Sequence, residues 1–445
     1  MIAEILCASL FAIAVVPSQT PYVRVTGTWQ VEVSSGVVKV GRKNVKISKP
    51  VNLTVAEPDL VVVKGEKYDT LPIYDATTAQ WVRGTRFHGL EAFECTATDL
   101  LVPESVVVKS EDGNIVYKLD VDYGLEGKWA TFGRLPGGSI PADKPVLVDF
   151  SYGKSRLDSI VVDQKGKVSL LQGISHAVTP KPPKLGADVT VLANVWVPGR
   201  LTALSNDNLY PIIEASYPEP KVKGNPTAAR LLPKTWAKLQ NGETVNVLAW
   251  GDSVTAGGQA SDAAHQYQSV FVAMLQKRFP KASVHLTTVG WGGRASDSFL
   301  AEPPGSAFNF KEKVLDPHPD LIVMEFVNDG YLNPEQVETK YSWLQQQFEG
   351  IGAEWVILTP HFVRHDWMNE PSVRVEKDPR SYTASVRAFT AKHSVALADA
   401  SLRWGHLLKE GIPYTTLLSN AINHPDDQGH EMFALSLMEL FGGNK

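Results

Sequence analysis

The second half of the chain is the more tightly constrained, because apolar strand patterns alternate with helical patterns from Thr244 onward. Strand patterns lie at Thr244–Trp250, Ser283–Val289, Asp320–Phe326, Glu354–Thr359 and Val395–Ala398, and helical patterns at Gln266–Phe279, Glu335–Glu349, Tyr382–His393 and Glu431–Phe441. Alternation at this spacing is typical of a parallel sheet with helices on both faces, connected right-handedly. The sequence therefore predicts an α/β domain over residues 243–445.

The first half has a different pattern, in which short strands with period-two alternation are separated by turns. The predicted strands are Val25–Val33, Val37–Ile47, Leu60–Val63, Ser105–Lys109, Ile115–Val121, Val146–Tyr152 and Val189–Val197. This pattern predicts an all-β sandwich, jelly-roll-like, over residues 21–217. Residues 218–242 are predicted to form a linker, rich in Pro and charge, and a connecting helix at Thr227–Leu239.

Length and charge narrow the class of protein. A chain of 445 residues is too long for one hydrophobic core, so two or more domains are expected. Its 43 basic and 48 acidic residues give a net charge of −5, and the Lys and Arg residues do not cluster. This balance gives no electrostatic basis for binding nucleic acid.

The N-terminal segment suggests export. Residues 2–16 are apolar over about the length of a signal-peptide core and are too short to span a bilayer, so residues 1–20 are predicted to be a signal peptide and the protein to be periplasmic or secreted. Glu4 lies where a basic residue is expected, and a misassigned start or a buried strand is the alternative. Cleavage would remove Cys7 and leave Cys95 without a partner for an internal disulfide.

A candidate nucleophile follows the first strand of the α/β domain. The stretch VLAWGDSVTAGGQ, residues 247–259, combines an apolar strand, a tight Gly-Asp-Ser turn and the approach to a helix. A serine on such a turn lies at the carboxyl end of a buried strand, where open α/β sheets bind their ligands. Ser253 is therefore a nucleophile candidate, and the alternative is that the tripeptide is an ordinary polar turn.

Three further segments accompany this turn. The chain reads TVGWGGRASDSF from Thr288, EFVNDG from Glu325 and NAINHPDDQGH from Asn420, each at a strand end or before the last helix. Together with GDSVT and in this order, these segments resemble the four blocks of the SGNH hydrolases, also called the GDSL esterase family. The resemblance covers residues 243–445 and is most similar to the carbohydrate acetylesterase members, such as rhamnogalacturonan acetylesterase.

The resemblance implies the roles of four residues. Ser253 is the nucleophile and His424, in Asn-His-Pro before the last helix, is the general base. His430 is the rival base, although a packing role suits it better. The oxyanion hole comprises the N–H groups of Ser253 and Gly293 and the side-chain amide of Asn328.

One position departs from the family pattern. The family usually places an Asp three residues before the histidine, and this chain has Ala421 there. Either the enzyme uses a Ser–His dyad, or another group orients the ring. The candidates are a backbone carbonyl and the side chains of Asn420, Asn423, Asp426, Asp427 and Glu325. Val327 is a second departure, since relatives often have a small or polar residue before the Asn.

Substrate contacts are predicted near these blocks, at Asp252, Trp291, Arg294 and His361. In TPHFVRHDW, Arg364, His365 and Trp367 are further candidates. The spacing of His361 and His365 resembles that of a zinc-binding helix, but Pro360 precedes the pair directly and no Glu follows His361. A metal site is therefore not predicted, and acyl transfer by serine needs no cofactor.

The first functional hypothesis is an exported esterase that removes acetyl groups from a polysaccharide or oligosaccharide, which would be its partner. A lysophospholipase or acyl-thioesterase of the same family is the second, and it would need a long apolar groove. The third is a glycan-binding protein with an inactive esterase domain, to which exposed Trp81, Trp129 or Trp196 would contribute. A core role for each tryptophan is the alternative.

Overall fold

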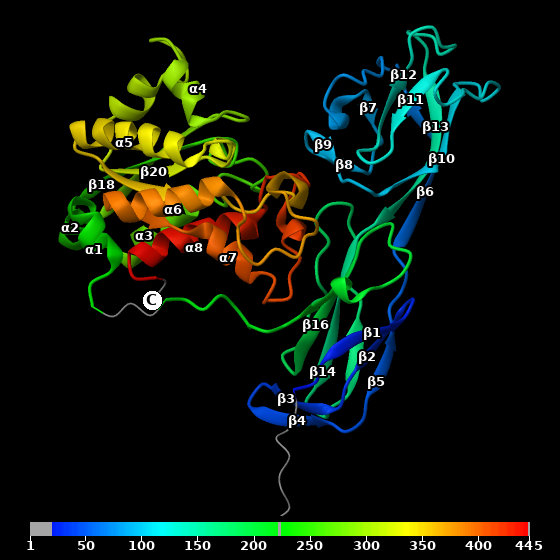
Figure 1. The fold of residues 1–445 in the computed structure, drawn as a ribbon, viewed down its shortest axis with the longest axis horizontal. Helices are drawn as coiled ribbons and strands as arrows, with labels where there is room; N and C mark the ends of the chain where they lie inside the picture. The colour runs from blue at the N-terminus through cyan, green and yellow to red at the C-terminus, as the bar shows by residue number, and fades with distance from the viewer. Residues whose placement is uncertain (1–19, 221–223, 444–445) are drawn as a thin grey trace, which may run out of the picture.

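The computed structural model describes residues 20–220 and 224–443. The predicted signal peptide lies almost wholly outside the described residues. Figure 1 shows a β region, residues 20–217, beside an α/β region, residues 227–443. Among the described helices, none is long and apolar enough to cross a membrane.

The α/β region is built on a five-stranded parallel sheet. Its strands are β18 (Thr244–Gly251), β19 (Ser283–Gly290), β20 (Leu321–Glu325), β21 (Glu354–Leu358) and β22 (Ala396–Ala398), in the order β19-β18-β20-β21-β22. All neighbouring pairs are parallel. The predicted fold class, a parallel α/β sheet preceded by an all-β region, is confirmed.

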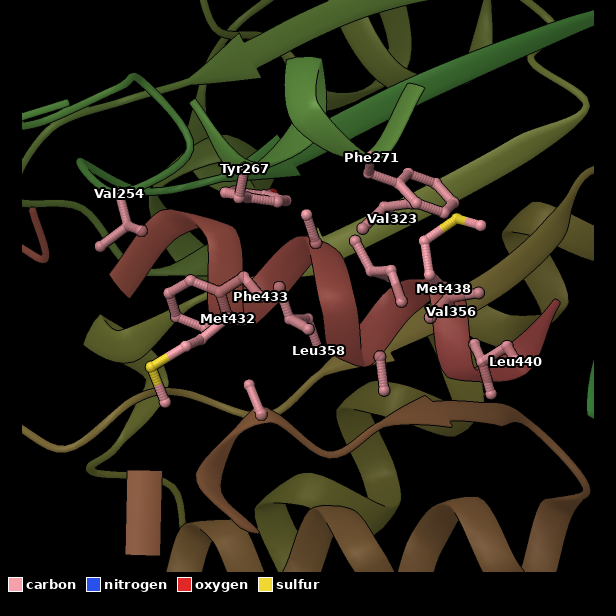
Figure 2. Packing of buried hydrophobic residues seen from close by; sticks show 14 of the residues in the cluster. Val254, Tyr267, Phe271, Val323, Val356, Leu358, Met432, Phe433, Met438 and Leu440 are labelled. Atoms are coloured by element: carbon pink, nitrogen blue, oxygen red, sulfur yellow. The ribbon is translucent and has the colours of Figure 1, made fainter. Parts of the chain in front are cut away.

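Alternate side chains of each strand enter different cores, as a pleated strand requires. On one face, Val323 and Val356 pack with α1 (Thr227–Leu231), α2 (Pro233–Asn241), α3 (Tyr267–Arg278), α7 (Ala400–His406) and α8 (Asp427–Leu440). Figure 2 shows Tyr267, Phe433 and Met438 of this core. On the other face, Ile322 and Met324 pack with α4 (Ser296–Ala301), α5 (Pro334–Gly350) and α6 (Ser381–His393).

The helices differ from the prediction in three places. The predicted helix 227–239 is two helices, because Leu232 leaves the helical conformation before Pro233, which begins α2. Helix α8 begins at Asp427, four residues earlier than predicted, since the Asp426 side chain caps it by accepting from the Gly429 N–H. The short helices α4 and α7 were not predicted.

The β region consists of antiparallel strands around two cores instead of one sandwich core. One core holds Val31, Ile160 and Val195, and its strands are β1 (Val23–Gly27), β2 (Gln30–Val33), β3 (Gly36–Val40), β4 (Lys43–Ile47), β5 (Val51–Thr54), β14 (Arg156–Asp163), β15 (Val168–Leu171), β16 (Val189–Val197) and β17 (Leu209–Pro211). The other holds Phe87 and Phe132, and its strands are β6 (Asp59–Tyr68), β7 (Thr85–Arg86), β10 (Leu101–Ser110), β11 (Tyr123–Glu126), β12 (Thr131–Arg134) and β13 (Val146–Lys154). The short strands β8 (Glu91–Ala92) and β9 (Cys95–Thr96) form a hairpin whose Ala92 and Cys95 pack in a smaller cluster with Trp129 and Ile422.

Several predicted strands are hairpins or turns. The predicted strand 25–33 divides into β1 and β2, and the predicted strand 37–47 divides into β3 and β4 at Gly41, whose φ of 59° suits a tight turn. The predicted strand 115–121 is a turn segment with isolated bridges. Figure 1 places β8 and β9 at the side of the β region that faces the α/β region.

Candidate active site

The four sequence blocks meet at one edge of the parallel sheet. Ser253 follows β18, Gly293 follows β19 and Asn328 follows β20, while His424 lies on the loop before α8. The carboxyl ends of parallel strands share one edge, which is where ligands bind in open α/β sheets. The topology therefore explains how residues up to 171 positions apart come together.

Ser253 lies on a turn whose close packing requires glycine at position 251. A Cβ on Gly251 would lie 2.1 Å from the Thr255 hydroxyl oxygen and 2.2 Å from the Glu325 carbonyl oxygen. After this close approach, the Ala256 N–H donates to the Asp252 carbonyl and the Gly258 N–H donates to the Ser253 carbonyl. The turn leaves Ser253 9% exposed, so its hydroxyl has limited access to solvent.

His424 is in position to act as the base. Its Nε2 lies 2.9 Å from the Ser253 Oγ, which is hydrogen-bond distance. Burial lowers the pKa of His424, and the nearby Glu94 carboxylate opposes this shift. The imidazole is therefore neutral at pH 7, the form that can accept the serine proton.

The rival histidine has a structural role. His430 lies within α8, is fully buried, and accepts a hydrogen bond from the Tyr267 N–H at Nδ1 (3.3 Å). Burial lowers the pKa of His430 to about 4.

The three donors predicted for the oxyanion hole lie on the loops that follow β18, β19 and β20. One N–H of the Asn328 amide donates to Asp252 Oδ2 (2.9 Å), which leaves the second N–H available. Gly293 is exposed with φ 70°, in a conformation that suits glycine, and a Cβ on Gly292 would lie 3.8 Å from the Ser253 Cβ. Within the described residues, the backbone N–H groups of Ser253 and Gly293 donate to no protein acceptor.

Asp252 holds the Asn328 side chain in place. Its carboxylate is fully buried and accepts from the Asn328 N–H and side-chain amide and from the Val254 N–H. Burial raises the pKa of this carboxyl group. The predicted substrate contact by Asp252 is wrong, because no part of this side chain reaches the surface.

Of the other predicted substrate contacts, one is buried and two are accessible. His361 is fully buried and hydrogen-bonds through Nε2 to the Asn423 carbonyl (2.6 Å), so it supports the loop of His424 instead of facing a substrate. Trp291 is half-buried, stacks on Phe308 with 4.4 Å between ring centroids, and lies 5.1 Å from the Arg294 guanidinium, which is exposed. Trp291 and Arg294 therefore remain available to a ligand.

The predicted ring-orienting groups are engaged elsewhere. Asp426 pairs with Lys181 (2.9 Å) and caps α8, Asp427 accepts from the Ser261 N–H, and the fully buried Glu325 accepts from the Thr255 hydroxyl. Asn420 Oδ1 accepts three backbone N–H groups, those of Ile422, Asn423 and His424. Asn420 therefore shapes the loop, whereas within the described residues His424 Nδ1 has no hydrogen-bond partner.

The β region also reaches the site, and the sequence analysis did not predict this. The exposed Phe93 ring lies 6.3 Å from the His424 ring, and Glu94 Oε1 lies 3.9 Å from His424 Nδ1. Both residues form the turn between β8 and β9. A turn this short in an unrelated region carries no catalytic motif, so no local signal identifies it.

Aromatic residues of both regions meet beside this turn. Trp129 is buried, the Arg364 guanidinium lies 4.4 Å from its ring, and Trp81 packs between Trp129 and Trp367 with centroid distances of 5.0 and 5.9 Å. Trp129 therefore has the core role that the sequence analysis gave as its alternative. Trp367 is 47% exposed, so part of this residue stays accessible beside the cluster.

Metal binding has no obvious location in the described part of the chain. Among those residues, no group of three or more His, Cys, Asp or Glu side chains is placed to hold a metal ion. Cys95 is free and buried, and burial raises the pKa of its thiol to about 12. Its Sγ donates to the Asn420 carbonyl (2.7 Å), which is a structural role.

Comparison with protein families identifies the class. Residues 249–432 match the GDSL-like lipase/acylhydrolase family, so this segment forms a GDSL-like lipase/acylhydrolase domain. A search of curated proteins found no match.

Solved structures give further likenesses. A two-domain esterase active on acetylated mannans is 18% identical, with a TM-score of 0.39 over 47% of this chain and 51% of the other. This chain thus spans about half the length of that esterase. A variant of an acetyl-xylooligosaccharide esterase from Geobacillus is 18% identical (TM-score 0.36, 44% of this chain, 94% of the other). An α/β hydrolase from the metagenome of Lake Arreo, Spain, is 19% identical (TM-score 0.35, 44% and 95%).

Proposed function

We propose that this protein is a serine esterase that removes O-acetyl groups from a polysaccharide or oligosaccharide. The observation that carries the proposal is the 2.9 Å contact between the Ser253 hydroxyl and His424 Nε2, next to N–H donors that no described protein group accepts. A nucleophile, a base and oxyanion donors are the parts that acyl transfer by serine needs.

The mechanism follows from this geometry. Ser253 Oγ attacks the ester carbonyl carbon while His424 Nε2 takes the hydroxyl proton. The developing oxyanion accepts hydrogen bonds from the N–H groups of Ser253 and Gly293 and from the Asn328 amide. His424 then gives its proton to the departing sugar hydroxyl, and water, deprotonated by the same ring, hydrolyses the acetyl-enzyme.

The surroundings of Ser253 support a carbohydrate over a lipid. Phe93 and Trp367 present exposed rings, and Arg294 adds a charged, exposed donor beside Trp291. Flat aromatic faces combined with polar donors suit a sugar, which has apolar ring faces and hydroxyl edges. A long acyl chain would instead need a continuous apolar groove.

The alternative functions give different results in one assay. A lysophospholipase or acyl-thioesterase would prefer p-nitrophenyl octanoate to p-nitrophenyl acetate. A glycan-binding protein with an inactive esterase domain would hydrolyse neither ester and would still bind glycan as Ser253→Ala. The short Ser253–His424 contact favours a working site over this third function.

The experiment is acetate release from acetylated xylan, pectin, mannan and alginate by the parent protein and by Ser253→Ala. Release by the parent and none by the variant is the expected result, and the responsive polymer identifies the glycan. A parent that releases no acetate and leaves p-nitrophenyl acetate intact contradicts the proposal. Because such polymers lie outside cells, the proposal includes export to the periplasm or medium.

A further inference from the structure

The Glu94 carboxylate and the His424 ring lie close together at the junction of the β and α/β regions. Within the described residues, His424 Nδ1 and Glu94 Oε2 are both buried and both lack a hydrogen-bond partner. The other oxygen of the same carboxylate, Glu94 Oε1, lies 3.9 Å from His424 Nδ1. Buried polar atoms are normally paired, and an exception calls for an explanation. Catalytic hydrogen bonds are often long before a substrate binds.

The Glu94 turn is held against the loop of His424. The Asn420 amide donates to Glu94 Oε1 (2.8 Å), and Cys95 Sγ donates to the Asn420 carbonyl (2.7 Å). Asn420 also accepts the His424 N–H, so one side chain links the carboxylate to the backbone of the histidine. The carboxylate is therefore held near the ring by contacts between the two regions.

The turn itself has a conformation typical of functional sites. Phe93 has φ 59°, which a bulky residue rarely adopts, and the Arg86 guanidinium donates to its carbonyl (2.5 Å). Paired strands on either side, with Ala92 opposite Cys95, keep the turn to two residues. This arrangement directs Glu94 toward His424 and Phe93 toward the surface beside it.

The position of the usual acid is covered by the same hairpin. Ala421 has φ 59° and packs against a cluster containing Ala92, Cys95 and Trp129 of the β region. Other family members have a carboxylate at this position, and this chain has Ala421 there, packed against the hairpin. The hairpin itself supplies a different carboxylate, that of Glu94.

We propose that Glu94 is the positioning acid of this site, supplied by the N-terminal β region to complete a Ser253–His424–Glu94 triad. The proposal rests on the proposed esterase function. A small rotation of the Glu94 side chain brings an oxygen to the proton on His424 Nδ1, which fixes the ring with Nε2 toward Ser253. When His424 takes the serine proton, the adjacent carboxylate stabilises the imidazolium and itself stays ionised.

Few other ionisable groups act on the charge of this ring. His361 and His430 lie nearby, and burial lowers the pKa of each, so both are neutral near pH 7. Asp426 is paired with Lys181. Glu94 is the group whose charge raises the pKa of His424 against the effect of burial.

The test compares Glu94→Gln with Glu91→Gln, a matched change at an exposed position of the same hairpin. The amide side chain of Glu94→Gln keeps the shape and the acceptor for Asn420 but removes the charge. On p-nitrophenyl acetate, we expect kcat to fall at least tenfold, toward the ~10⁴-fold loss seen for acid-to-amide changes in triads. KM is expected to change less than twofold, and Glu91→Gln to match the parent in both constants.

The pH profile separates positioning from mere packing. The acidic limb of kcat/KM reports the protonation of His424, so removing a negative charge should move this limb to lower pH in Glu94→Gln. Glu94→Asp, which keeps the charge, should leave the limb close to that of the parent. Unchanged kcat in Glu94→Gln would overturn the proposal, and so would an unmoved limb.

Failure of the esterase function gives a separate result. A parent with no Ser253-dependent turnover contradicts the proposed function, and Glu94 is then tested by NMR titration of protein carrying ¹³C-labelled histidine. The His424 signal, assigned from its loss in His424→Asn, should titrate at lower pH in Glu94→Gln. An unchanged His424 titration overturns the role of Glu94 whether or not the protein has activity.

Discussion

The two regions contribute to the same site in different ways. In the proposed site, the α/β region supplies the reacting groups from loops at one edge of a parallel sheet, so its contribution follows from topology. The β region supplies one two-residue turn, anchored by contacts such as Glu94 to Asn420 across 326 positions of sequence. In the proposed site, the reacting groups therefore come from the α/β region, and the positioning carboxylate comes from the β region.

This difference predicts an order of effects. Substitutions of reacting groups in the α/β region should reduce turnover most, whereas substitutions at the junction should affect orientation and stability. If substitutions in the turn of the β region lowered kcat nearly as much as substitutions of the reacting groups, the β region would contribute directly to turnover. The following variants measure that order, beginning with the largest expected loss.

His424→Ala should lower kcat at least about 10⁴-fold, because nothing else within hydrogen-bond distance of the Ser253 hydroxyl can take its proton in the described structure. The assay is p-nitrophenyl acetate hydrolysis. His265→Ala, at an exposed histidine of the same region, serves as the control and should retain full activity. A tenfold loss or less in His424→Ala would assign the base to another residue.

Asn328→Ala should lower kcat about 10²- to 10³-fold, as expected for the loss of one oxyanion donor. KM should change little, because the hydrogen bond forms mainly in the transition state. The side chain also donates to Asp252, so a thermal unfolding measurement is needed to show that the variant remains folded. A rise in KM with unchanged kcat would instead indicate that Asn328 binds the ground state.

The sequence predicts the α/β region well because its signals are local. Apolar strands alternate with helices along the chain, three of the four blocks follow strand ends that a parallel sheet must bring together, and the fourth precedes the last helix. The Ser253, Gly293, Asn328 and His424 blocks accordingly lie at one edge of the sheet. The predictions for buried Asp252 and His361 failed because a sequence does not show on which side of a loop a polar side chain lies.

The β region is less predictable for physical reasons. Strand β14 was missed although its residues are buried, because Arg156 and Asp158 interrupt the apolar pattern and satisfy each other inside the protein (2.7 Å). The division into two cores depends on long-range pairing of β6 with β13 and of β14 with β16. Glu94 was missed for the same reason, since only the docking of the two regions places it near His424.

Acid should destabilise the α/β region through its buried histidines. Burial lowers the pKa of His430 from 6.5 to about 4, so between these pH values the unfolded chain binds a proton that the folded chain does not. Stability should fall as pH falls through this window, by roughly 3 kcal/mol for this residue. Urea unfolding at pH 7 and pH 4.5 should show a smaller pH dependence in His430→Asn than in the parent. Equal pH dependence would contradict this account.

Asn420→Ala should cost about 1–3 kcal/mol in the free energy of unfolding, because it leaves buried N–H groups of the His424 loop without an acceptor. Turnover should also fall, since the same side chain holds Glu94. Ser419→Ala provides a control in the same loop. Urea unfolding and kcat, measured on both variants, test whether this one residue couples stability to orientation.

Lys181→Ala should have the smallest effect. Lys181 lies in the β region and pairs with Asp426 of the α/β region, but its side chain is 54% exposed, and pairs of this kind contribute at most about 1 kcal/mol. Asp426 also retains its cap on α8, so kcat should be unchanged. Thermal unfolding at low and high salt measures the contribution. A loss larger than that of Asn420→Ala would mean that exposed charges, and not the buried contacts of the Glu94 turn, hold the two regions together.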